Sequence, residues 1–261
     1  MADSEEKISQ DFVNDSSEED ENREGEVEMT FLDHLEELRW RIIYSLIGIV
    51  LGTIIALIFI DFFINNILLF PAKTANFKLQ NLRPFGQLIL YFQVAAIIGL
   101  ILSFPNVVYQ LWKFIAPALR QSEKKYIKWI VLFTTFCFIC GIVFGYYLML
   151  PLTLKFAAGF GTTSIANNFS LEEYLSIVLS IILGAGIVFE LPMLSFFLSR
   201  IGILTPKFMR KYRRHAIVII MILAAFLSPG TDPVSQVMLA IPLVFLYEIS
   251  ILVSKIFQKK S

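Results

Sequence analysis

One carboxylate stands inside a long apolar stretch of this sequence. Between Tyr174 and Ser199 the chain runs for 26 residues with a single charge, Glu190. A helix of about 20 apolar residues crosses a hydrocarbon core, and an acid there costs about 3 kcal/mol unless it finds a partner, water or a proton. Pro192 lacks an amide proton and loosens the backbone beside the acid. Glu190 is either a side chain that snorkels from a helix end or a polar recognition point within the bilayer.

Two further acidic residues lie in stretches of sequence that are otherwise basic or apolar. Glu37 falls within His34–Arg41, and Glu123 follows the segment Phe114–Arg120. A carboxylate can grip the planar fork of a guanidinium through two parallel hydrogen bonds, so acids of this kind suit a receptor for arginine. The plainer interpretation is that Glu37 pairs with Arg41 at i,i+4, and Glu123 with a nearby lysine, on solvated helix faces.

No catalytic or metal-binding pattern emerges from the sequence. His34 begins His-Leu-Glu-Glu-Leu rather than the zinc motif His-Glu-x-x-His, and His215 stands alone in a basic segment. Cys137 and Cys140 have redox-motif spacing but lie in an apolar run, which favours packing. We therefore expect no enzyme activity, no metal and no cofactor. Membrane topology accounts for the basic loops, so nucleic acid is not expected as a partner.

The composition indicates a membrane protein with several helices. Hydrophobic residues make up 56% of the chain and charged residues only 17%, which excludes an ordinary soluble domain. The charges are unevenly distributed, because residues 1–28 carry 12 acidic and two basic side chains. Such a segment buries too little surface to fold alone, so we expect a disordered acidic tail, with docking to a partner as the alternative. Residues 29–257 form the predicted membrane domain, and residues 258–261 a basic C-terminal tail.

Helical segments between the charged loops predict an all-α, polytopic protein with six transmembrane helices. An apolar face at helical spacing begins at Phe31 and predicts an amphipathic helix that runs into the first span. Pro105 should kink the second span or mark its cytoplasmic end. The fifth and sixth spans are expected to be short and to form a hairpin. The six expected spans are Ile42–Ile60, Phe85–Tyr109, Trp129–Leu150, Tyr174–Ser199, Ala216–Leu227 and Val234–Val253.

Lysine and arginine counts orient these spans. Outside the acidic tail, 16 basic residues fall on the side that holds both ends of the membrane domain and only four on the other side. Cytoplasmic loops carry the excess of lysine and arginine in membrane proteins. Both termini are therefore predicted to be cytoplasmic.

Four stretches, in this order on six spans, resemble the TatC family, the receptor subunit of the twin-arginine protein translocase. The resemblance runs from about Met29 to Phe257 and is most specific in His34–Arg41, Ser103–Leu119, Phe189–Pro192 and Ser235–Pro242. It implies a cup-shaped helical receptor that binds twin-arginine signal peptides of folded proteins. It also implies recruitment of the single-span subunits TatA and TatB for export driven by the proton motive force. A bacterial inner membrane is the expected location, with a thylakoid membrane as the alternative.

The same resemblance implies roles for particular residues. The signal peptide would be bound by Glu37, Arg39, Phe114 and Glu123. Partner subunits would be bound by Glu190, Ser228 and Gln236. Pro71, Pro105 and Asp232 match further positions that are important in the family. The protein is expected to form a homo-oligomer within a larger complex in the lipid bilayer.

A proton-coupled secondary transporter is the competing functional class. In that interpretation Glu190 is the ion site, and the purified protein takes up a small solute in liposomes. A translocase receptor takes up no solute and binds a twin-arginine peptide instead.

The charge count makes a direct topological prediction. Alkaline phosphatase fused after Lys260 should be inactive, because the enzyme folds only outside the cytoplasm, whereas a fusion near Asn167 should be active. Colony assays of both fusions would measure this. An active enzyme at the C-terminus would overturn the six-span arrangement.

Overall fold

The computed structural model describes residues 31–74, 78–116, 127–159, 169–200, 202–227 and 233–257. The predicted acidic tail, residues 1–28, and the basic end, residues 258–261, lie outside these ranges. The chain divides into two units, residues 1–43 and residues 44–261, and each is considered by itself.

The described chain is built almost entirely of helices. Two strands, β1 (Leu79–Gln80) and β2 (Phe169–Ser170), pair in parallel and join two loops. The long helices are interrupted by two π-helical turns, η1 (Phe63–Leu68) and η3 (Gly145–Met149). The α-helices are α2 (Phe31–Ile58), α3 (Ile60–Phe62), α4 (Phe70–Thr74), α5 (Gly86–Ile115), α7 (Ile127–Phe144), α8 (Leu150–Gly159), α9 (Leu171–Val188), α10 (Leu191–Arg200), α11 (Pro206–Lys211), α12 (Arg213–Leu227) and α13 (Pro233–Phe257).

The spans expected from the sequence are present as helices. Within the described ranges, five helical stretches are long and apolar enough to cross a membrane, at Leu32–Ile58, Gly86–Ile115, Ile127–Lys155, Leu171–Arg200 and Leu239–Ile256. The predicted fifth span corresponds to α12, whose 15 residues extend about 22 Å, less than the hydrocarbon core. The all-α, polytopic membrane architecture is therefore confirmed.

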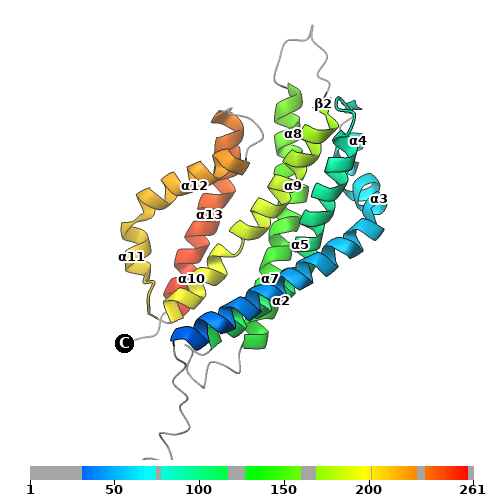
Figure 1. Ribbon diagram of the computed structural model, residues 1–261. Coiled ribbons are helices and arrows are strands. Elements are labelled where there is room, and N and C mark those ends of the chain that lie inside the picture. The colour runs from blue at the N-terminus through cyan, green and yellow to red at the C-terminus, as the bar shows by residue number, and fades with distance from the viewer. Residues whose placement is uncertain are drawn as a thin grey trace, which may run out of the picture. The chain divides into compact units, whose positions relative to one another are not determined.

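Helix α5 continues for ten residues past Pro105 to Ile115, so the helix itself does not end at this proline, which was predicted to kink the span or to mark its cytoplasmic end. One detail differs from the expectation. The sixth helix, α13, has 25 residues and is longer than expected, since it continues past Val253 to Phe257. The hairpin of the last two spans therefore joins one short and one long helix. Figure 1 shows α12 in orange and α13 in red as neighbours, and the two helices are in contact.

Glycine brings two pairs of helices into close contact. Where α2 crosses α5, a Cβ atom added to Gly52 would lie 2.5 Å from the carbonyl oxygen of Gly99. Where α7 meets α9, a Cβ atom added to Gly141 would lie 2.6 Å from the carbonyl oxygen of Ala185. Small residues allow such backbone contact, and in lipid this packing takes the place of the hydrophobic effect between helices.

A buried pair of hydroxyls marks a third crossing. Ser199 of α10 and Ser254 of α13 share a hydrogen bond of 2.6 Å, and both side chains are fully buried. Along the same helices Ser195 and Ser250 are buried as well. The four small side chains let α10 pack along α13, so α10 belongs with the C-terminal helices.

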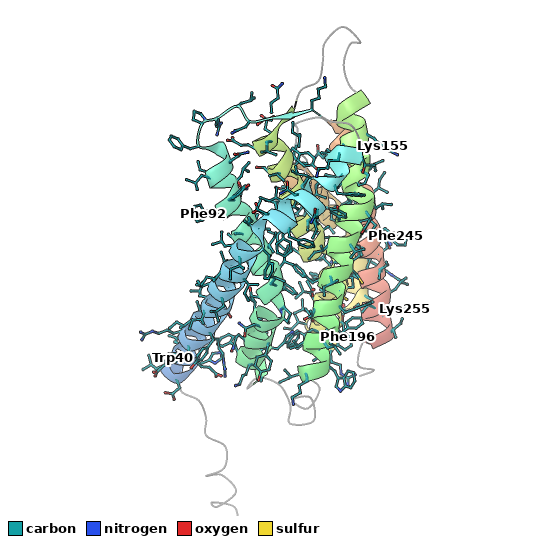
Figure 2. All side chains as sticks on the ribbon, turned by 90° about the vertical axis from the view of Figure 1, so that its right-hand side faces the viewer. Trp40, Phe92, Lys155, Phe196, Phe245 and Lys255 are labelled. Atoms are coloured by element: carbon teal, nitrogen blue, oxygen red, sulfur yellow. The ribbon has the colours of Figure 1, made fainter. Side chains whose placement is uncertain are left out.

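The second unit has two distinguishable ends. Figure 2 shows Lys155 toward one end and Lys255 toward the other, with Phe245 between them on α13. On the loops near the start of α9, Arg83 forms an ion pair with Glu172 at 3.3 Å, beside the paired strands β1 and β2. This ion pair and the strand pairing join the loop before α5 to the start of α9.

Candidate functional site

Glu190 lies at a break between two helices. Helix α9 ends at Val188 and α10 begins at Leu191, and Figure 1 shows the interruption between the two ribbons. The Glu190 amide donates to the Ile187 carbonyl at 3.1 Å, and the Glu190 carbonyl accepts from the Leu194 amide at 2.8 Å. Pro192, the second residue of α10, has no amide proton for the Val188 carbonyl one turn earlier. The break lies where the proline predicts it.

The carboxyl group of Glu190 has hydrogen-bonding capacity that the described residues do not use. The side chain is half-buried, and its Oε1 atom is buried without a hydrogen-bond partner among the described residues. The neighbouring Phe189 ring packs on Phe144, with 5.1 Å between the ring centres. A carboxyl group in this position can accept a hydrogen bond, or donate one when it is protonated. The break therefore presents unused hydrogen-bonding capacity inside a membrane span.

The C-terminal hairpin is described only in part. Gln236 of α13 donates from Nε2 to the Met221 carbonyl of α12 at 2.9 Å, so its amide ties the two helices of the hairpin together. Ser228 and Asp232, which the family resemblance also implies as functional positions, lie outside the described residues. Gln236 is therefore the member of this predicted group that the structure describes, and it already has an internal bond.

Pro71 belongs to a distorted helical segment that two tyrosines hold in place. Because Pro71 has no amide proton, the Ile67 carbonyl lacks its usual helical donor, and the Tyr146 hydroxyl donates to it at 2.7 Å. The Tyr174 hydroxyl donates to the Leu68 carbonyl at 2.7 Å and accepts from the Ala72 amide at 3.2 Å. Tyr174 thus stands between a donor and an acceptor that would otherwise bond to each other.

The sequence pattern alone does not single out Tyr146 and Tyr174. Tyr146 and Tyr174 lie at or near the ends of apolar runs, where a tyrosine ordinarily anchors a helix at the membrane interface. One feature of the sequence could have pointed to them. A buried tyrosine hydroxyl needs a hydrogen-bond partner, and each proline in an apolar helix leaves a carbonyl without its usual donor. Only the fold shows that the partners are the carbonyls next to Pro71.

The residues predicted to bind a signal peptide fall in different parts of the chain. In the first unit, Glu37 and Arg39 lie on α2, and Glu37 Oε1 accepts from Arg41 Nη2 at 2.6 Å. The i,i+4 pair considered as the plainer interpretation is therefore present. In the second unit, Phe114 is half-buried in the last turn of α5. Glu123 lies outside the described residues.

The described ranges can also be examined for a metal site. Among the residues they contain, no group of three or more histidine, cysteine, aspartate or glutamate side chains could hold a metal ion. What these ranges offer is a paired acid on α2 and an unsatisfied acid in a helix break.

The sequence matches the family described as Sec-independent protein translocase protein (TatC) over residues 33–242. This match covers most of the chain and includes every site residue named above. The chain belongs to the TatC family. It is thus a component of the twin-arginine protein translocase, and its family is one of protein transport.

Curated relatives and solved structures agree with the family. The chain is 36% identical to the TatC proteins of Carboxydothermus hydrogenoformans and of a Blattabacterium species, with 89% of this chain covered in both cases and 95% and 97% of the relatives. It is also similar to a crystal structure of the twin-arginine translocase receptor TatC, with a TM-score of 0.78 and 36% identity, over 85% of this chain and 98% of that one. The six-span arrangement of the TatC chain is consistent with this match.

The environment of Tyr174 predicts a measurable loss of stability. Tyr174→Phe keeps the ring but leaves the Leu68 carbonyl and the Ala72 amide without the hydroxyl, so the free energy of unfolding should fall by about 1–3 kcal/mol. Tyr147→Phe is the matched control, because Tyr147 is 71% exposed. Denaturant titration of the purified TatC protein in detergent micelles measures both. Equal stability of the two variants would contradict the assigned role.

Proposed function

We propose that this TatC protein is the receptor subunit that binds twin-arginine signal peptides of folded proteins. The observation that carries the proposal is the similarity over most of the chain to a solved twin-arginine translocase receptor. The residues proposed to bind the peptide are Glu37, Arg39, Phe114 and Glu123.

The pairing of Glu37 supports a role in binding arginine. Its Oε1 atom already accepts from a guanidinium, that of Arg41, while its Oε2 atom has no hydrogen-bond partner among the described residues. A carboxylate can hold a guanidinium through both oxygens at once. In the absence of peptide, Arg41 therefore occupies one half of the proposed binding group, and an incoming arginine would use the other half or replace Arg41.

Glu190 has a different proposed partner. Its unsatisfied oxygen lies in a helix break inside a membrane span, where a polar group on an apolar partner helix would find a strong hydrogen-bonding site. We assign Glu190, together with Ser228 and Gln236, to the binding of TatA- and TatB-type subunits. Pro71, Pro105 and Asp232 are proposed to shape the receptor rather than to contact the peptide.

The proposed location is a bacterial inner membrane, with both termini in the cytoplasm. The bacterial sources of the relatives and the excess of basic residues on one side support it. The protein would act there as part of a homo-oligomer within the larger translocase, driven by the proton motive force. The competing interpretation as a proton-coupled transporter is not favoured, because the family is one of protein transport.

Peptide binding tests the receptor role. Glu37→Gln and Glu123→Gln should each weaken binding of a twin-arginine peptide by roughly tenfold, because a charge-assisted pair contributes about 1.5–3 kcal/mol. Arg41→Gln should strengthen binding by freeing Glu37, and a twin-lysine peptide should bind the parent protein more weakly. Fluorescence anisotropy with a labelled peptide measures each affinity.

Glu36→Gln is the matched control for these variants, since Glu36 neighbours Glu37 on the same helix. It should leave the affinity unchanged. If both the Glu37 and the Glu123 variants bind the twin-arginine peptide with unchanged affinity, these two acids do not take part in peptide binding.

Crosslinking tests the role of Glu190. A photoreactive residue at position 190 should crosslink to a single-span subunit in membranes. Glu190→Gln should keep the contact between the two proteins, because glutamine retains a donor and an acceptor, and Glu190→Ala should lose it with peptide binding unchanged. Crosslinks to lipid alone, with export intact in the alanine variant, would favour the snorkelling interpretation.

A further inference from the structure

The segment between α10 and α12 carries an unusual concentration of positive charge. From Arg200 to Arg214 there are six basic residues, and no acidic residue occurs between Glu190 and Asp232. Within the described part of this segment, the ion pair is that of Arg213 with Glu248 of α13, at 2.6 Å. Lys207, Arg210, Lys211 and Arg214 are exposed to solvent.

Aromatic side chains are interleaved with these cations. Phe208 and Tyr212 are 51% and 40% exposed, and their ring centres lie 4.5 Å apart. The Lys211 ammonium lies 5.8 Å from the centre of the Tyr212 ring. The opposite face of α11 is buried at Pro206 and Met209, and the Tyr247 hydroxyl of α13 donates to the Met209 carbonyl at 2.8 Å. Helix α11 is therefore anchored with its basic and aromatic face outward.

The exposed surface changes character within one turn of α12. Arg213, Arg214 and His215 are exposed and polar, whereas the exposed side chains from Ile217 onward are apolar, including Val218, Ile219 and Ile222. Such a change marks the boundary between the polar headgroup layer and the hydrocarbon core. The cations of α11 and of the first turn of α12 consequently lie at headgroup level.

The short length of α12 strengthens this placement. Its 15 residues extend about 22 Å against a core of about 30 Å, so its ends are drawn toward the bilayer or the bilayer thins around it. Either adjustment brings lipid phosphates close to Arg210, Lys211 and Arg214. Exposed aromatic rings beside basic residues are typical of helices that lie in the membrane interface.

We propose that this surface, formed by Lys207, Phe208, Arg210, Lys211, Tyr212 and Arg214, is a binding site for the headgroups of anionic phospholipids. The phosphate groups would interact with the basic side chains, and the two rings would insert at the level of the glycerol backbone. An acidic segment of another protein would match the charges but not the outward rings or the adjoining apolar face of α12. None of these six residues is among those assigned to the signal peptide or to the partner subunits.

Lipid titration of the purified full-length protein tests the proposal. Native mass spectrometry in detergent would compare the binding of phosphatidylglycerol with that of phosphatidylcholine. The triple variant Lys207→Gln, Arg210→Gln, Lys211→Gln should bind phosphatidylglycerol at least tenfold more weakly, given roughly fivefold per cation near an anionic surface. Binding of phosphatidylcholine should not change. Inorganic phosphate at the same concentration should not displace the lipid, because it lacks the acyl chains.

The matched control removes three exposed cations elsewhere, in Lys113→Gln, Lys128→Gln, Lys255→Gln. It should bind phosphatidylglycerol like the parent protein. Glu248→Gln provides a test in the opposite direction, because it releases Arg213 from its ion pair and should tighten the binding. An equal loss of phosphatidylglycerol affinity in the two triple variants would contradict the proposed site and indicate that the lipid responds only to the overall positive charge of the surface. Displacement of the lipid by a polyglutamate peptide would overturn it in favour of an acidic protein partner.

Discussion

Backbone hydrogen bonding in a medium without water is the constraint on which this structure depends. Every proline inside a membrane helix removes a donor and leaves a carbonyl to be satisfied by other means. Next to Pro71, the hydroxyls of Tyr146 and Tyr174 take over two carbonyls. Next to Pro192, the helix instead divides into α9 and α10. The same problem thus has two outcomes, a helical segment braced by tyrosine hydroxyls in one place and a helix break in the other.

These two solutions have different consequences for function. In the tyrosine-held segment, the Ile67 and Leu68 carbonyls and the Ala72 amide all have hydrogen-bond partners within the protein. The break leaves an oxygen of Glu190 without a partner among the described residues, in a region where such a group is costly. A partner that supplies a hydrogen bond at this position removes that cost, so a small contact can contribute a large share of the binding free energy. The proposed role of Glu190 as a docking point rests on this difference.

Much of the fold could be predicted because hydrophobic length and charge placement are local properties of the sequence. The helical spans and the short α12 follow from them. A loosened backbone beside Pro192 follows from the missing amide proton of proline, but the division into α9 and α10 is seen only in the structure. The continuation of α5 past Pro105 could not be predicted in this way, because packing against other helices decides whether a helix continues through a proline. In the candidate site, Glu37, Glu123 and Glu190 could be identified because each is an acidic residue within a basic or apolar stretch of sequence. Their partners, such as the Met221 carbonyl bound by Gln236, depend on which helices become neighbours.

The close helix crossings limit how this protein can change over time. At Gly52 and Gly141 the neighbouring backbone lies where any side chain would begin. Every codon change that replaces a glycine adds at least one carbon atom, so these positions have no conservative substitute within a single mutational step. Because the nearest atoms belong to the backbone of the opposite helix, no substitution there can make room, and a side chain at such a crossing requires the two helices to move apart. The lipid-facing positions of the same helices carry no such restriction, and one helix can contain faces that diverge at very different rates.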